Sequence, residues 1–223
     1  MRFLLFLILL FVSNSFATET FFIKKLSKNY DVKIEVKKNE YGYLRGKATF
    51  TIFKKNSQKP FQTFNFRQTL ILLDDNGQPE IEKIKNSKYS SIYLEDFNFD
   101  GYEDLALCDG SNGGYSSTSY KVYIFNVEKK HFVFNKKFTY LAQGPFYGIF
   151  KIDYKKRSYE VSMSSGYGFY ETQRYKLIGK KLVKYYVCSR SADLKEHEIW
   201  HIDTSILING KWKIWYRTEK DKI

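Results

Sequence analysis

Hydrophobic and polar residues alternate with a period of two along many short stretches of this chain. Val32, Ile34 and Val36 are separated by charged residues, a pattern typical of a strand with one buried face. Residues 191–198 have room for one short helix, and no long stretch shows a helical period. Similar patterns predict further strands at residues 48–53, 61–66, 121–125, 132–134, 149–153, 159–163, 175–178, 182–187, 205–208 and 212–216.

Short polar turns separate these stretches. Asn209-Gly210 lies between two of them, and Asn-Gly is the strongest short signal for a two-residue β-hairpin. Gly179-Lys180 suits the same kind of turn. The sequence therefore predicts an all-β fold, with a single domain of consecutive antiparallel hairpins over residues 18–223. A propeller-like arrangement, an irregular barrel and a sandwich all fit this pattern.

The N-terminal residues predict export. Arg2 precedes an apolar run from Phe3 to Val12, and Ser15-Phe16-Ala17 offers a cleavage site with small residues, so residues 1–17 are expected to be a signal peptide. The apolar run is shorter than the about 20 residues that a membrane span needs. We therefore expect a mature chain that begins near Thr18, resides in the periplasm or is secreted, and has no stable membrane insertion.

Composition narrows the choice of partners. Lys and Arg number 37 against 24 Asp and Glu, a formal net charge of +13. Nucleic acid is the usual partner of so basic a protein, but an exported protein rarely meets it and the sequence contains no nucleic-acid-binding motif. Anionic envelope polymers, lipid head groups or an acidic protein are better candidates. The oligomeric state stays open at this stage.

The mature chain contains two cysteines, Cys108 and Cys188. An oxidising compartment would permit them to form a disulfide. The sequence does not show that the two residues are close enough to bond. Buried free thiols are the alternative.

The most distinctive polar segment is the loop at residues 96–104. Its spacing suits calcium, because acidic and amide side chains alternate and Gly101 permits the sharp turn around the ion. Leu107 stands where a helical EF-hand has its last glutamate, so we expect a shorter loop between two strands. A metal-free turn rich in Asp and Asn is the alternative. The predicted calcium ligands are Asp96, Asn98, Asp100, the carbonyl of Tyr102, and Asp104.

The segment His197-Glu198-Ile199-Trp200-His201 matches the signature of zinc proteases. That signature works only on a helix, where both imidazoles reach one metal ion. The flanking residues alternate like those of a strand, on which the two histidines would lie about 13 Å apart. A zinc metalloprotease is therefore the least favoured hypothesis, and no other catalytic signature appears in the sequence.

A family resemblance rests on the acidic loop together with Cys108, Asn112-Gly113-Gly114-Tyr115 and residues 119–125. This segment resembles the periplasmic immunity proteins that accompany peptidoglycan-hydrolase effectors of the antibacterial type IV secretion system in Xanthomonas-like bacteria. That family is similar to the periplasmic lysozyme inhibitors. The resemblance implies a non-enzymatic β protein that binds calcium through the loop described above and inhibits a cell-wall hydrolase.

A later loop is the candidate contact with that hydrolase. Residues 164–170 combine small residues with three aromatic rings, and aromatic anchors dominate the energetics of interfaces. The alternative is that these rings belong to the core. An envelope or adhesion module that binds an anionic glycan is the competing function. Since the chain is basic, the inhibited hydrolase should be acidic, at least locally. The predicted partner-binding residues are Tyr167, Phe169, Tyr170 and Arg174.

Overall fold

The computed structural model describes residues 17–24, 26–37, 44–81, 90–166, 168–193, 195–196 and 198–220. Nearly all of the predicted signal peptide lies outside these ranges, as do Tyr167 and His197. Within the described ranges, no helix is both long enough and apolar enough to cross a bilayer.

Three antiparallel sheets make up the fold, and in each sheet the strands follow one another in sequence order. The first sheet contains β1 (Thr18–Ile23), β2 (Tyr30–Lys37), β3 (Ala48–Lys54) and β4 (Pro60–Phe66). The second contains β5 (Ile92–Glu95), β6 (Asp104–Gly110), β7 (Ser119–Asn126) and β8 (His131–Phe134). The third contains β9 (Lys151–Asp153), β10 (Ser158–Ser164), β11 (Phe169–Ile178), β12 (Lys181–Ala192), β13 (Ile199–Ile208) and β14 (Lys211–Lys220).

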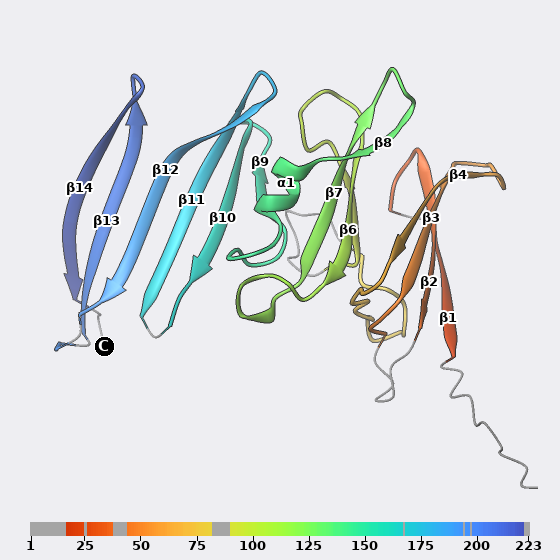
Figure 1. Ribbon diagram of the computed structural model, residues 1–223, viewed down its shortest axis with the longest axis horizontal. Helices are drawn as coiled ribbons and strands as arrows, with labels where there is room; N and C mark the ends of the chain where they lie inside the picture. The colour runs from red at the N-terminus through yellow and green to blue at the C-terminus, as the bar shows by residue number, and fades with distance from the viewer. Residues whose placement is uncertain are drawn as a thin grey trace, which may run out of the picture.

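The sheets stand in a row along the long axis of the molecule (Figure 1). Each is a meander of hairpins, which confirms the predicted all-β fold of consecutive antiparallel hairpins. Among the described strands none of the sheets closes into a barrel, since each retains two edge strands. The row is therefore an open stack of sheets.

The second sheet is buried on both faces. Leu105 and Leu107 of β6 belong to the hydrophobic core shared with the first sheet. Ala106 and Cys108, which alternate with them, belong to a second core shared with the third sheet. Successive side chains of a strand point to opposite faces, so a central sheet needs an uninterrupted apolar run, and residues 105–108 supply it.

One short helix, α1 (Lys136–Leu141), helps to cover the second core with the buried side chains of Phe138 and Leu141. The Asn135 side chain caps it by accepting hydrogen bonds from the backbone N–H groups of Lys137 and Phe138. The sequence did not predict this helix.

Over its described residues, the helix expected at residues 191–198 is wrong. Ser191 and Ala192 continue β12, where they pair with His201 and Trp200 of β13, and this cross-strand pairing overrides local propensity. The hairpin predicted at Asn209-Gly210 is confirmed. Both residues have positive φ, +51° and +77°, as the tight turns that suit hairpins require.

Candidate functional site

Hydrogen bonds from its own backbone hold the acidic loop between β5 and β6 in a tight curl. The Asp96 carboxylate accepts from the N–H groups of Asp100 (3.0 Å) and Gly101 (2.8 Å). The Asp100 carboxylate accepts from the Tyr102 N–H at 2.9 Å. Gly101 has a φ of +89°, a conformation that glycine adopts without strain. The sequence-predicted curl around Gly101 is therefore present.

Asp104, the last residue of this loop, is fully buried. One of its carboxylate oxygens accepts from the N–H groups of Phe97 (2.8 Å) and Asn98 (3.2 Å), and the other accepts from the N–H of Phe125 in β7 (2.8 Å). Burial raises the pKa of Asp104 to about 8, and the neighbouring loop carboxylates add to the rise, although the backbone N–H groups oppose it. Asp104 therefore ties the loop to β7. A cation bound nearby would favour the ionised form of its carboxyl group.

The described residues contain no group of three or more His, Cys, Asp or Glu side chains placed to hold a metal ion. In the acidic loop, the carboxylates of Asp96 and Asp104 both accept hydrogen bonds from backbone N–H groups. Calcium also accepts amide and carbonyl oxygens, so a site here would combine Asp96 and Asp100 with the Asn98 side chain and the Tyr102 carbonyl. The donor chemistry fits a hard cation, and calcium binding stays a prediction.

The acidic loop also contacts the third sheet. The Tyr159 hydroxyl of β10 donates to the carbonyl of Phe97 at 2.6 Å. The Arg157 guanidinium donates to the carbonyl of Phe99 and lies 5.1 Å from the centre of its ring. These contacts place the loop at the joint between the second and third sheets. The conformation of the acidic loop therefore affects how the third sheet packs against the second.

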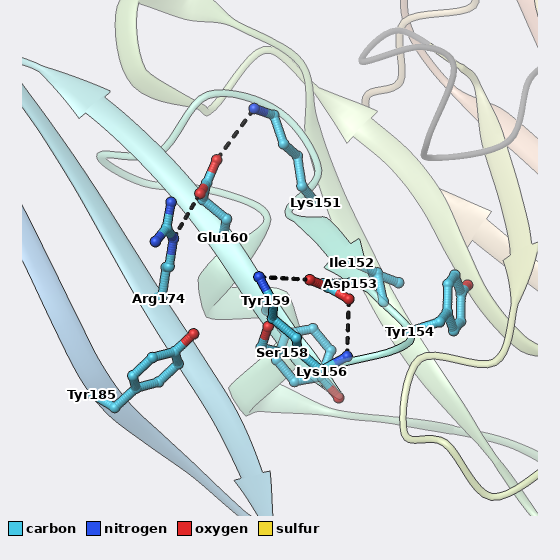
Figure 2. Close-up of a pocket in the computed structure, with 10 residues that line it drawn as sticks. All are labelled: Lys151, Ile152, Asp153, Tyr154, Lys156, Ser158, Tyr159, Glu160, Arg174 and Tyr185. Carbon is cyan, nitrogen blue, oxygen red and sulfur yellow. Dashed lines mark hydrogen bonds and ion pairs between the residues drawn. The ribbon is translucent and has the colours of Figure 1, made fainter.

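A cavity of about 490 Å³ opens beside this joint, lined by residues of β9, β10, β11 and β12. Figure 2 shows the Glu160 carboxylate between two cations, with Lys151 Nζ at 3.2 Å and Arg174 Nε at 2.9 Å. Burial opposes ionisation of Glu160, but the hydrogen bonds from Arg174 and Lys151 outweigh it and lower its pKa. The charges that line the cavity thus largely neutralise one another.

The described members of the predicted partner-binding set, Phe169, Tyr170 and Arg174, do not form one cluster. Arg174 is engaged by Glu160 and lies 4.5 Å from the ring centre of Tyr186. Tyr170 is 54% exposed, but it lies about 13 Å from Arg174 along β11. Phe169 is half-buried and, as the neighbour of Tyr170 in the strand, it points to the opposite face of the sheet. Of the described members of this set, Tyr170 is the most exposed.

The sequence did not single out Tyr115 as a site residue, although it lies in the segment that carries the family resemblance. Its side chain is 65% exposed, and its hydroxyl donates to the carbonyl of Gly166 at 3.3 Å. The ring of Tyr147 lies 6.2 Å from that of Tyr115, and the Tyr147 hydroxyl bonds to Ser164. The turn after β6 and the loop between β10 and β11 therefore meet in one exposed surface.

Two glycines make this meeting possible. A Cβ atom on Gly113 would lie 2.3 Å from Ser117 Oγ, and one on Gly114 would lie 2.5 Å from the carbonyl oxygen of Pro145. Both distances are too short for a larger residue without displacement of its neighbours. The Gly-Gly pair thus lets the turn sit close against residues 145–147, and this placement presents Tyr115.

Both cysteines carry free thiols, so the possible disulfide is not formed in this structure. Cys108 lies in β6 of the second sheet and Cys188 in β12 of the third. Burial raises the pKa of the Cys108 thiol, which keeps it protonated. Cys188 is half-buried and accepts a hydrogen bond from the Thr204 hydroxyl.

The zinc hypothesis requires a helix around His201, and the structure has a strand there. Ile199–Ile208 forms β13, which confirms the strand predicted from alternation. The His201 imidazole bonds to the Asp193 carboxylate at 2.9 Å. The helical spacing on which the signature depends is therefore missing over the described part of the motif.

Comparisons with known proteins bear on the fold. No family model matches the chain, and no curated protein matches it. Among solved structures, it is similar to a Xanthomonas type IV secretion system related protein, with a TM-score of 0.64 and 18% sequence identity over 91% of this chain and 94% of that chain. This likeness shows a shared fold. It agrees with the secretion-system part of the resemblance drawn from the sequence, and the immunity role stays a prediction.

Proposed function

We propose that this chain is an exported, non-enzymatic inhibitor of a peptidoglycan hydrolase, of the immunity type, with a calcium-stabilised loop. The observation that carries the proposal is the joining of two loops by the contact between Tyr115 and Gly166. The turn of Tyr115 belongs to the segment that carries the family resemblance, and the loop of Gly166 is the one that its small and aromatic residues marked as the candidate contact with a hydrolase. The shared fold with a type IV secretion system related protein supports the same proposal.

The geometry suits a plug for a sugar-binding groove. Tyr115 projects from a turn that is fixed at its base by the close packing of Gly113 and Gly114. A ring presented in this way loses little conformational freedom on binding. Its side chain combines an apolar ring with a polar hydroxyl, a combination that is common among the aromatic hot-spot residues of interfaces.

Calcium would act at a distance from this surface. The acidic loop precedes β6 and the Gly-Gly turn follows it, so the two lie at opposite ends of that strand. Residues 95–104 contain five acidic side chains and no Lys or Arg. A bound cation would supply the missing positive charge, held by Asp96, Asn98, Asp100 and the Tyr102 carbonyl. Its role would be to stabilise the joint between the second and third sheets.

Hydrolysis of labelled peptidoglycan tests the proposal. The chain should slow at least one member of a panel of lysozymes and lytic transglycosylases that includes any hydrolase encoded beside its gene. Tyr115→Ala should weaken inhibition about 30-fold, the effect of losing an interface hot spot. Phe22→Ala is the matched control, because Phe22 is 64% exposed on β1 of the first sheet. The proposal fails if every hydrolase in the panel, including the neighbouring one, is unaffected by the unmodified chain.

The competing function, a module that binds an anionic glycan, has support of its own in the third sheet. Lys176 lies 4.9 Å from the ring centre of Tyr185, and Arg190 lies 4.1 Å from that of Trp200. Cations beside aromatic rings can bind acidic sugars through charge and stacking. Co-sedimentation with purified, undigested cell wall decides between the two functions. Binding without inhibition of any hydrolase would favour the glycan module.

A further inference from the structure

The last strand of the third sheet is an open edge. β14 lies at the end of the strand order and at one end of the row of sheets (Figure 1). Every residue of β14 is exposed, although the strand carries four large apolar side chains. Exposed edges of this kind are templates for pairing with another chain. The apolar side chains are Trp212, Ile214, Trp215 and Tyr216.

The phase of the hairpin fixes which backbone groups are free. Ile208 and Lys211 flank the two-residue turn and pair with each other, so the Lys211 N–H is directed at β13. In an antiparallel ladder this direction alternates along the strand. The odd-numbered residues of β14 therefore bond to β13. The residues whose N–H and C=O groups face outward are Trp212, Ile214, Tyr216, Thr218 and Lys220.

From this edge we infer that β14 pairs with β14 of a second copy of this chain, antiparallel about a two-fold axis at Tyr216. This register sets Lys213 opposite Glu219 of the partner and Trp215 opposite Arg217 of the partner, each twice by symmetry. An ion pair and a cation–aromatic pair both stabilise directly opposed cross-strand positions. Tyr216, which is 74% exposed, meets its symmetry mate.

Registers shifted by one residue in either direction oppose like charges. Because outward-facing residues must pair with outward-facing residues, the axis can move only by whole residues along β14. An axis at Trp215 opposes Lys213 and Arg217, which are both positive. An axis at Arg217 opposes that residue to itself, and an axis at Ile214 opposes Lys211 and Arg217. Like charges opposite each other destabilise a sheet, so the axis at Tyr216 gives the longest pairing free of such contacts.

The ion pair within β14 does not oppose this arrangement. Arg217 and Glu219 form an ion pair within one strand at 3.0 Å, with side chains 65% and 47% exposed. An exposed ion pair of this kind stabilises little. Arg217 and Glu219 therefore lose little stability when they exchange this pair for contacts with a second copy. The edge pairs nine residues from each copy, less than a standard interface, so we expect a dissociation constant on the order of tens of micromolar.

Sedimentation of the chain from Thr18 onward, over a wide range of concentrations, tests the inference. The unmodified chain should pass from monomer to dimer. Glu219→Lys places like charges opposite each other twice and should weaken the dimer about tenfold. Lys213→Glu should do the same, and the double exchange Lys213→Glu with Glu219→Lys should restore the dimer. Such restoration requires the two positions to face each other between copies, since they do not pair within one hairpin.

A proline variant tests the role of the backbone. Tyr216→Pro removes an outward-facing N–H that bonds to nothing in the hairpin, and edge strands tolerate proline at such a position. The variant should stay folded by circular dichroism and sediment as a monomer. A chain that is monomeric at every concentration overturns the inference. So does a double exchange that fails to restore association while each single variant remains folded, because another surface or partner would then cover β14.

Discussion

The buried carboxylate of Asp104 makes a specific prediction about stability and pH. In the metal-free protein its pKa is raised from 3.8 to about 8. Between these two values the folded chain holds a proton that the unfolded chain has released, so the free energy of unfolding falls as pH rises. One pH unit corresponds to about 1.4 kcal/mol. From about pH 5 to about pH 8 the loss therefore approaches about 4 kcal/mol.

The Asp104→Asn variant isolates this effect, because an amide has similar shape and does not titrate. It retains one oxygen to accept N–H groups and turns its own NH₂ toward the remaining donor, which costs about 1–3 kcal/mol. Near pH 5 the unmodified protein should therefore be the more stable. Near pH 8 the gap should close or invert, since only the unmodified protein has lost stability through Asp104.

Urea denaturation in the presence of a chelator measures this difference. Circular dichroism follows the sheets, and tryptophan fluorescence follows β13 and β14, which contain all three tryptophans. Asp74→Asn is the control, because the Asp74 carboxylate also accepts two backbone N–H groups but is exposed to solvent. A gap between unmodified protein and Asp104→Asn that stays constant across this pH range would refute the reasoning. Calcium should flatten the pH dependence of the unmodified protein.

Three further predictions concern other parts of the chain. Calcium at about 100-fold above its dissociation constant should raise the melting temperature by about 5 °C or more, and calorimetry of Asp100→Ala should show no such response; equal responses would make the loop an ordinary turn. Gly114→Ala brings a Cβ to 2.5 Å from a backbone carbonyl, so in urea unfolding it should cost about 1–3 kcal/mol, and in the hydrolase assay it should weaken inhibition by displacing Tyr115; unchanged stability would contradict the close packing. Thiol titration should find Cys188 reactive in the native protein and Cys108 only after unfolding; no titratable thiol would indicate a disulfide.

The strands could be predicted because their signals are local. The alternation from Val32 to Val36 and the Asn209-Gly210 turn each depend on a few adjacent residues. The short helix α1 escaped prediction because six residues are too few to display a helical period, and its Asn135 cap was the one local signal. The false helix at 191–198 failed because cross-strand pairing, which local pattern does not reveal, extends β12.

The candidate site was predictable only in its parts. The acidic loop carries its own spacing, so its curl around Gly101 could be expected from the sequence. The contact of Tyr115 with Gly166 joins residues 51 positions apart, and no periodic pattern reports such a contact. Arg174 was expected to bind a partner, yet Glu160 lies directly opposite it in the β10–β11 pairing. Only the register of that hairpin could have revealed the ion pair.

The burial of the second sheet on both faces has a consequence for how the molecule opens. The first and third sheets each pack against one face of the second sheet. The two cores therefore lie one after the other along the row of sheets, and contacts between neighbouring sheets dominate, as in repeat proteins. Amide hydrogen exchange should then be slowest in β6 and β7 and fastest toward β14. Loss of either end would leave the rest intact, whereas opening of the middle requires both cores to separate at once.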